Sequence, residues 1–278
     1  MNRLNSISIS RRNKIWISIF LLSGIAYFGF PLYWIAISTT KVDGDFNTSN
    51  PLWFGSTIHP LQNIHDLFTG NNGIYARWFF NSLFYSGTSA LVIVIVSAFG
   101  GYALSKLINR GANFIGATTI GMIMVPANTL VVPLFILFAR IHLNGTIWSV
   151  LLPMLPSPLG LFLVKYYVDR NVNNEVLNAA RLDRASELHI FRKIVLPIIK
   201  PMLGTVFLIA FVTNCNAYFL PQIMLNDPKL YPVTVGLANW FGGQSALIGI
   251  FVAIMPSVLA FFYLQRNWKH SLMDGESR

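Results

Sequence analysis

The chain has 278 residues, of which 54% are apolar and 14% aromatic, whereas only 11% are charged. A soluble domain carries about 25% charged residues, so the composition argues against an ordinary soluble enzyme and predicts a membrane protein. The 20 Lys and Arg outnumber the 10 Asp and Glu, but they lie between apolar runs and form no single patch. This distribution argues against a nucleic-acid partner and favours a membrane protein.

The first apolar run covers 15–37 and has 23 residues, which corresponds to about 34 Å of helix and crosses a hydrocarbon core of about 30 Å. It is longer than the apolar part of a signal peptide, so we interpret it as a retained span. Further apolar runs predict spans at 80–104, 114–138, 148–164, 201–220 and 247–264. We therefore expect an all-α membrane protein with six spans in a single domain, 1–278.

Basic residues between the spans predict the orientation of the chain. With the amino terminus in the cytoplasm, 16 of the 20 Lys and Arg lie inside, and only Lys41, Arg77, Arg140 and Lys229 lie outside. This asymmetry follows the positive-inside rule. We expect a multi-pass protein of the cell membrane with both termini in the cytoplasm, where the long connection 165–200 also lies.

Prolines interrupt several predicted spans. They are Pro126 and Pro133 in the third, Pro153, Pro156 and Pro158 in the fourth, and Pro256 in the sixth. Each proline removes a backbone donor, and the carbonyls that it frees need partners from protein or from water in a cavity. The sequence therefore predicts a packed and partly hydrated bundle.

The spans contain no Asp or Glu, and the five histidines are scattered through loops and tails without the spacing of metal ligands. Ion-coupled transporters usually need ionisable groups inside the membrane, so an autonomous secondary transporter or a channel is the weaker alternative. The phosphate-binding pattern G-x-x-x-x-G-K-[ST] is absent as well. We expect no enzyme activity, metal or cofactor in this chain, and a nucleotide that powered it would bind another chain.

Charge gathers at about 170–200, around NAARLDRASELHIFRKIVLP. Asn173 or Asn174 can cap a short helix over 175–182, with Glu175 near its positive end. A second helix is expected from Ser186, with an apolar stripe along the membrane face, followed by a turn at Pro197 and Pro201 into the fifth span. On these residues alone, the segment is either a connector against anionic lipid headgroups or a rigid helix that docks in a partner.

The same segment resembles the cytoplasmic signature of ABC-importer permeases, E-A-A-x3-G-x9-I-x-L-P, with matches at Ala179, Ala180, Ile194, Leu196 and Pro197. The stretches MIMVPANTLVVPLF, LNGTIWSVLLP and AYFLPQIML are similar to the carbohydrate branch, the maltose-transporter-like permeases. Asn178 replaces the glutamate of the signature. Arg184 replaces its glycine, so we expect no positive φ angle at residue 184.

The resemblance implies a type I ABC-importer permease fold with a cytoplasmic coupling helix. It further implies a heterodimer with a second permease, two cytoplasmic ATPase subunits that bind ATP and Mg²⁺, an external solute-binding protein and a sugar as cargo. A glycerol phosphate ester is the alternative cargo. The residues expected to couple to the ATPases are Glu175, Asn178, Ala179, Ala180, Asp183, Arg184, Glu187, Ile194, Leu196 and Pro197.

Polar residues within the spans are candidates for a translocation pathway, because sugars need hydrogen-bonding groups. They are Asn128 and Thr129 beside Pro126, and Thr213, Asn214, Asn216 and Tyr218 in the fifth span. Asn214 and Tyr218 are four residues apart, which would place them on one helix face. The alternative is that these side chains only join helices to one another.

Overall fold

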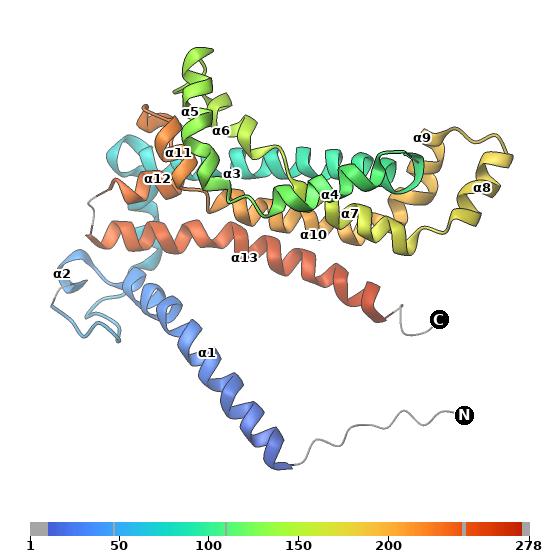
Figure 1. Cartoon of the computed structure of the whole chain (residues 1–278). Coiled ribbons are helices and arrows are strands. Elements are labelled where there is room, and N and C mark those ends of the chain that lie inside the picture. The colour runs from blue at the N-terminus through green and yellow to red at the C-terminus, as the bar shows by residue number, and fades with distance from the viewer. Residues whose placement is uncertain (1–10, 47, 109, 241–242, 274–278) are drawn as a thin grey trace. The chain divides into compact units, whose positions relative to one another are not determined.

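The computed structural model describes residues 11–46, 48–108, 110–240 and 243–273, and every regular element in these ranges is a helix (Figure 1). The chain forms two compact units. The first comprises Met1–Phe68 and Gly242–Val252, and the second comprises Thr69–Phe241 and Ala253–Arg278. Two helices contribute to both units, namely α3 (Pro60–Tyr102) and α13 (Gly243–Met273).

The first unit contains α1 (Arg11–Thr40), α2 (Asp43–Phe46) and the loop that follows them. Hydrogen bonds close this loop onto the end of α1. The buried Lys41 donates from Nζ to the carbonyl of Asn50 at 2.7 Å, and the amide of Asn63 donates to the carbonyls of Thr39 and Lys41. The buried Gln244 also donates to the carbonyl of Lys41.

The second unit holds most of the helices. After α3 and the π-helical turn η1 (Ala103–Leu107), these are α4 (Ala112–Ile123), η2 (Ala127–Leu130), α5 (Val131–Arg140), α6 (Ile147–Met154), α7 (Pro158–Asn171), α8 (Asn174–Leu182), α9 (Glu187–Ile190), η3 (Phe191–Val195), α10 (Leu196–Cys215), α11 (Phe219–Met224), η4 (Pro228–Leu230) and α12 (Val233–Ala238). In Figure 1, α8 and α9 lie at one end of this unit and α5, α6, α11 and α12 at the other.

The core of the second unit lies where α3, α7 and α10 pack together. Val164, Val168, Val195 and Ile199 are fully or almost fully buried there. Gly101 permits the close approach of α3 to α7, because a Cβ at this position would lie 2.6 Å from Cγ1 of Val164 and 2.8 Å from a backbone nitrogen of α7. A small residue is therefore required at this crossing.

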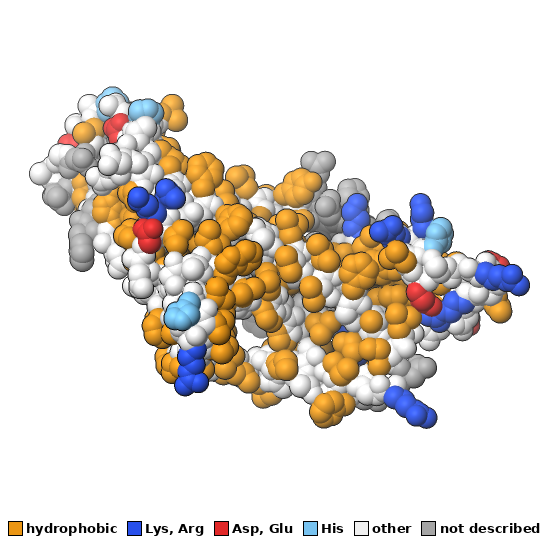
Figure 2. Space-filling model, turned by 90° about the horizontal axis from the view of Figure 1, so that it is seen from above, with side chains coloured by type: hydrophobic (Ala, Val, Ile, Leu, Met, Phe, Trp, Pro, Cys, Tyr) orange, Lys and Arg blue, Asp and Glu red, His pale blue; other side chains and the backbone are white. Residues whose placement is uncertain are grey.

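Apolar side chains also cover much of the face shown in Figure 2. Large hydrophobic residues are highly exposed along the long helices, for example Phe20 and Phe114 at 76% each and Ile95 at 55%. An apolar surface of this extent is far beyond what a soluble monomer exposes, and it is typical of contact with lipid. Each unit thus has the surface expected of a membrane protein.

Five described helices are long and apolar enough to cross a membrane: Asn13–Thr40, Pro60–Leu107, Ile147–Asn171, Glu187–Cys215 and Gly243–Leu264. The predicted third span is instead a bent pair, Phe114–Ile123 and Ala127–Arg140, whose axes meet at 91°. Pro126 lies at the bend in an extended conformation. The six predicted spans are reached when this pair is counted as one, and proline causes the break as expected.

The prediction of a separate helix along the membrane face before the fifth span is wrong. The chain from Glu187 to Cys215 is one continuous helix that includes the π-helical turn η3. No turn occurs at either predicted proline, because Pro197 lies in the first turn of α10 and Pro201 lies inside this helix. The wider π turn before it accommodates the missing N–H, so the proline does not force the chain to turn there. This helix also ends at Cys215, five residues before the predicted end.

Candidate functional site

The charged segment folds into α8 as the sequence predicts, with one residue more at its start. The side chain of Asn173 caps the helix by accepting a hydrogen bond from the backbone N–H of Glu175 at 2.9 Å. Leu177 is 1% exposed and belongs to the core of the second unit. Lys106 of η1 donates to the side chain of Asn174 at 2.8 Å. The short helix is thus fixed both by a cap and by a buried anchor.

The expectation for Arg184 is wrong, because this residue has a φ of +58°. The backbone N–H of Ala185 donates to the carbonyl of Ala180, and that of Arg184 donates to Arg181, each at 3.0 Å. These two bonds form a Schellman motif, which requires a left-handed residue at the position of Arg184. The helix end therefore keeps the backbone geometry of a glycine, at a cost of about 1 kcal/mol for a larger residue.

The outer ridge of α8 consists of Val176, Ala179 and Leu182, which are spaced three residues apart and are all exposed. Leu182 is 84% exposed and Val176 49%, so the ridge is apolar and lies open. Ala180, by contrast, is partly buried against the core. The two alanines of the signature therefore have different surroundings, and only Ala179 is available to a partner.

The other predicted coupling residues divide in the same way. Ile194 and Leu196 are partly buried and pack against the core cluster that also contains Leu177 of α8. Glu175, Asn178, Asp183 and Pro197 are exposed. The signature thus combines an exposed helix with the buried side chains that support it.

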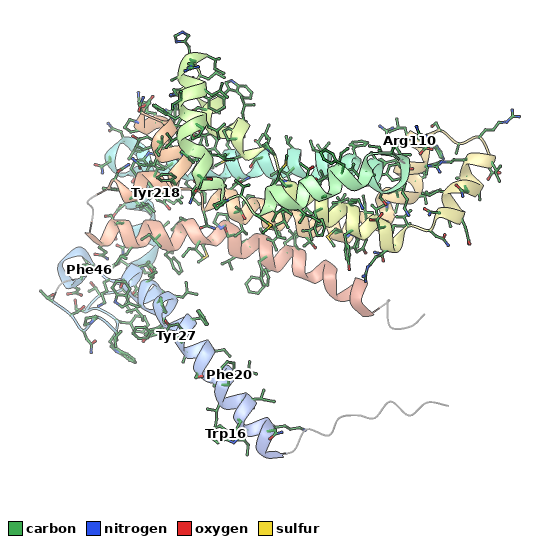
Figure 3. The ribbon with its side chains drawn as sticks, in the orientation of Figure 1. Trp16, Phe20, Tyr27, Phe46, Arg110 and Tyr218 are labelled. Carbon is green, nitrogen blue, oxygen red and sulfur yellow. The ribbon has the colours of Figure 1, made fainter. Side chains whose placement is uncertain are left out.

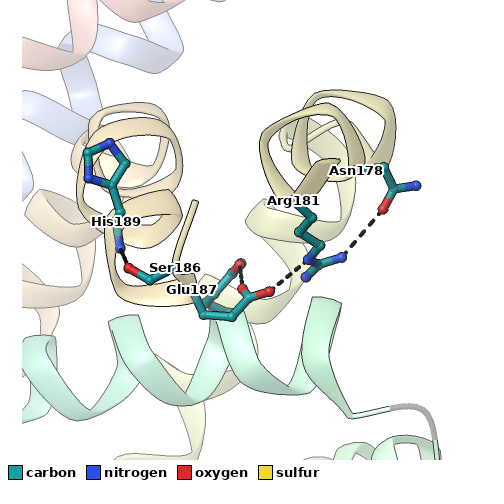
Figure 4. A network of polar contacts seen from close by, with 6 residues as sticks. Asn178, Arg181, Ser186, Glu187 and His189 are labelled. Atoms are coloured by element: carbon teal, nitrogen blue, oxygen red, sulfur yellow. Dashed lines mark hydrogen bonds and ion pairs between the residues drawn. The ribbon is translucent and has the colours of Figure 1, made fainter. Parts of the chain in front are cut away.

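Glu187 joins α8 to two other helices (Figure 4). Its Oε1 accepts from Nε of Arg181 at 2.7 Å, and its Oε2 accepts from the hydroxyl of Tyr102, at the end of α3, also at 2.7 Å. Arg181 makes a longer contact of 3.4 Å with the side chain of Asn178, and its hydrogen bond to Glu187 raises the pKa of Arg181. The sequence analysis did not single out Tyr102, because 85 residues separate it from Glu187.

A cavity of about 870 Å³ lies away from α8, where three interruptions of the helices meet. Its lining includes residues of the bend between α4 and η2, of the break between α6 and α7, and of the break between α10 and α11. Broken helices at membrane depth are tolerated where they line a cavity, because the freed backbone groups meet water or a ligand there. This cavity is the candidate translocation site.

The cavity brings together most of the predicted pathway residues. Asn128, Thr213, Asn214, Asn216 and Tyr218 all line it, whereas Thr129 does not and donates its hydroxyl to the carbonyl of Pro126. Figure 3 shows Tyr218 and Arg110 near opposite ends of the second unit. Five of the six predicted pathway residues thus share one cavity.

These polar side chains have different partners. The amide of Asn214 donates to Oγ of Ser89 on α3 at 2.7 Å, and that of Asn216 donates to the carbonyl of Val212. Asn128 and Tyr218 have no hydrogen-bond partner for their side chains within the described part of the chain. Asn214 therefore joins helices, while Asn128 and Tyr218 keep free polar groups at the cavity.

Asn214 and Tyr218 do not lie on one helix face, so that part of the pathway prediction is wrong. The helix α10 ends at Cys215, and Tyr218 precedes α11 with φ −122° and ψ −56°. Asn216 is the C-cap of α10, and both its backbone N–H and its side-chain amide donate to the carbonyl of Val212. The two residues reach the same cavity because the chain breaks between them.

Comparison with known proteins decides the family. Residues 109–269, more than half of the chain, match the family model of the binding-protein-dependent transport system inner membrane component. The chain belongs to this family. The permease is thus a multi-pass membrane component of an ABC importer, as the signature around α8 indicated, and the family is one of permease subunits, not of enzymes.

Relatives cover nearly the whole permease. The arabinooligosaccharides transport system permease protein AraQ of Bacillus subtilis is 25% identical over 268 residues, which are 94% of this chain and 95% of AraQ. The sn-glycerol-3-phosphate transport system permease protein UgpE of Escherichia coli is 24% identical and covers 95% and 99% of the two chains.

A solved structure shows the same fold. It is a chain of a bacterial ABC transporter involved in the import of the acidic polysaccharide alginate, and it matches with a TM-score of 0.79 at 20% identity. The match covers 93% of this chain and 98% of that one. The predicted fold class, an all-α ABC-importer permease, is therefore confirmed.

Proposed function

We propose that this permease imports a carbohydrate across the cell membrane, together with a second, homologous permease, two cytoplasmic ATPase subunits and an external solute-binding protein. ATP and Mg²⁺ bind to the ATPase subunits and not to this chain. The outer ridge of α8 docks in an ATPase subunit, and the cavity beside the broken helices forms part of the pathway. The observation that carries the proposal is the pairing of this exposed, rigidly anchored helix with a cavity in one helical unit.

Docking at α8 is supported by what the ridge exposes. Val176, Ala179 and Leu182 offer an open apolar strip next to small side chains, and Leu177 and the cap at Asn173 hold the helix in place. A helix so anchored moves as a body when its partner closes, because its contacts with the bundle move with it. Coupling requires that the docked helix prefer one state of the ATPase pair over the other.

Charge around α8 supports a cytoplasmic position for this end. The exposed basic residues at this end are Arg184, Arg192, Lys193 and Lys200, and the partly buried Lys106 of η1 donates to Asn174 at the start of α8. Basic residues accumulate on the cytoplasmic side of membrane proteins. In the proposed importer, this end of the second unit therefore faces the cytoplasm.

The lining of the cavity favours a neutral sugar over a glycerol phosphate ester. Its described lining contains amides, the hydroxyls of Ser157 and Thr213, the phenol of Tyr218 and apolar side chains, but no Lys, Arg or His. A phosphate dianion in such a site would lack the cationic partners that charge-assisted binding needs. Relatives are named for arabinooligosaccharides and for lactose but also for sn-glycerol-3-phosphate, so the lining of the cavity, and not the names of the relatives, favours the sugar.

Reconstitution of the complete complex tests the proposal. The permease, its sister permease, the ATPase subunits and the binding protein, identified as products of neighbouring genes, are placed in liposomes, and uptake of labelled oligosaccharides and of labelled glycerol 3-phosphate is measured with and without ATP. We expect ATP-dependent sugar uptake, and none with this chain alone. Uptake by the chain alone in an ion gradient, or uptake of only the phosphate ester, would contradict it.

A further inference from the structure

The contacts of Glu187 extend further than a local support of α8. Both oxygens of its carboxylate are used, and they are used by side chains from two different helices, Arg181 on α8 and Tyr102 at the end of α3. Hydrogen bonds with a charged partner are shorter and stronger than those between neutral groups. Glu187 also lies in the first turn of α9, where the helix dipole favours a negative charge.

Tyr102 is held so that its hydroxyl reaches Glu187 in one orientation. The residue is 3% exposed, and its ring packs against Phe191 with a centroid distance of 5.7 Å. Phe191 in turn stacks on Phe99 of α3 at 4.5 Å. A displacement of Glu187 is therefore passed to the end of α3, because the phenol cannot turn aside without breaking this packing.

The helix α3 connects Tyr102 to a residue that contacts the lining of the cavity. Ser89 lies 13 residues before Tyr102 on this helix, which is about 20 Å along its axis. It is fully buried, and its Oγ accepts the hydrogen bond from the amide of Asn214. Asn214 lies at the last turn of α10 and lines the cavity next to the break before α11.

We propose that Glu187 is a positioning residue that passes the displacement of α8 through Tyr102 to α3, and through Ser89 to Asn214 at the break of α10. The inference rests on the proposed function, and it names the residues through which that function is coupled. Two hydrogen-bonded junctions, one at Tyr102 at the end of α3 and one at Ser89 in its interior, make this connection, which runs beside the continuous helix Glu187–Cys215. If either junction is lost, the ATPase subunits still hydrolyse ATP, but each hydrolysis cycle displaces the helices at the cavity less.

Tyr102→Phe tests the first junction, because it removes the hydroxyl and keeps the ring that packs on Phe191. In the reconstituted complex we expect the sugar imported per ATP hydrolysed to fall at least about fivefold, as for a typical loss of coupling between sites. The matched control is Tyr166→Phe, since Tyr166 is exposed on α7 and its hydroxyl has no hydrogen bond within the described part of the chain. This control retains the wild-type ratio.

Glu187→Gln is the second variant, because its side chain has the same shape but only one oxygen to accept the two hydrogen bonds. It also guards against a failure of Tyr102→Phe to assemble. The expected result is the same fall in the ratio, with the ATPase subunits still bound. If either variant assembles and keeps the wild-type ratio of uptake to hydrolysis, the inference is overturned.

A double variant separates transmission from a general loss of packing. When Tyr102→Phe is combined with Ser89→Ala, which removes the second junction, a relay in series predicts no more uncoupling than in the worse single variant. Independent structural defects would instead multiply, and that outcome also contradicts the inference.

Stimulation of ATP hydrolysis by the solute-binding protein provides a readout that does not depend on the cargo being a sugar. Coupling of binding between two sites is reciprocal, so the outer face should also act on the ATPases through the same residues. We expect this stimulation to fall in Tyr102→Phe and in Glu187→Gln. A wild-type complex whose ATP hydrolysis is stimulated but which imports no sugar would contradict the proposed cargo only. Undiminished stimulation in both variants would contradict the connection from Glu187 to Asn214.

Discussion

Leu177 and Ala179 lie two positions apart on α8 and have opposite surroundings, since Leu177 is 1% exposed in the core and Ala179 is exposed on the outer ridge. The two residues therefore separate the two tasks of this helix. Leu177 anchors it to the bundle, and Ala179 belongs to the face that a partner can reach. Substitutions at the two sites should fail in different ways.

Ala179→Glu should abolish coupling without unfolding the permease. The new carboxylate is solvated on the free chain, but it would be buried without a partner in the docked complex, which costs several kcal/mol. We expect the protein to be present at wild-type levels while ATP-dependent uptake is lost. Asn226→Glu is the control, because it adds the same charge at an exposed site two residues after α11, the helix at the opposite end of the second unit from α8. Wild-type uptake by Ala179→Glu would contradict docking at this residue.

Leu182→Ser and Leu177→Ala should give opposite results in two assays. Leu182 is 84% exposed, so its loss should leave the melting temperature of the purified permease unchanged and weaken the binding of the ATPase subunits. Loss of the buried Leu177 should destabilise the packing around α8 by about 2–5 kcal/mol. Melting curves and co-purification of the subunits distinguish the two, and unchanged co-purification of Leu182→Ser would remove it from the docking surface.

Arg184→Gly should stabilise the end of α8. A φ of +58° is strained for arginine and not for glycine, and the relief of about 1 kcal/mol is partly offset by the greater freedom of glycine in the unfolded chain. We expect slower hydrogen exchange at the amide of Ala185, whose bond to Ala180 closes the helix end. Arg184→Val, with a β-branched residue at the same φ, should exchange faster, and equal rates in all three proteins would argue against the left-handed conformation.

Gly101→Ala should destabilise the contact between α3 and α7. Its Cβ would meet Cγ1 of Val164 at 2.6 Å and backbone at 2.8 Å, and overpacking of this kind costs about 1–3 kcal/mol. Gly87→Ala on the same helix is the matched control, because nothing lies within 4 Å of the added carbon and alanine favours the helix. The melting temperature should fall for Gly101→Ala alone, and a fall of equal size in both variants would indicate that α3 tolerates no substitution.

Asn128→Leu and Tyr218→Phe should weaken sugar transport at the cavity. Each removes a polar group that has no partner within the described residues, so the group is free for the cargo. Loss of one neutral hydrogen bond is worth about 1 kcal/mol, which corresponds to a KM about fivefold higher. Thr129→Val is the control, because Thr129 lies next to Asn128 and does not line the cavity. Unchanged KM values in both cavity variants would place the pathway elsewhere.

Local signals were sufficient to predict α8. The cap at Asn173, the acidic first turn and the small side chains at Ala179 and Ala180 all act within a few residues of sequence, and the helix begins one residue before its predicted start. The apolar runs likewise predicted the long helices, because span length follows from bilayer thickness. The left-handed conformation of Arg184 was missed because glycine is only preferred, and not required, at a positive φ angle. Here the hydrogen bonds of the Schellman motif outweigh that preference.

Contacts between distant residues could not be predicted. Tyr102 and Glu187 are 85 positions apart, and Ser89 and Asn214 are 125 apart, so neither pair leaves a periodic signal in the sequence. The break after Cys215 is a different case. All residues of 213–218 except Ala217 are weak helix formers, so a local signal for a break was present, but the apolar run that continues to Leu220 outweighed it in the prediction.

The convergence of three interrupted helices on one cavity has a consequence for how the substrate specificity of this permease can evolve. Unwound backbone presents carbonyl and amide groups whatever side chains it carries, so part of the surface offered to a cargo is independent of the local amino acids. Substitutions in the neighbouring side chains can then change the selectivity, while the polar backbone groups of the cavity stay the same. A lineage of such permeases could thus acquire new nutrients by a handful of point mutations, with its architecture left intact.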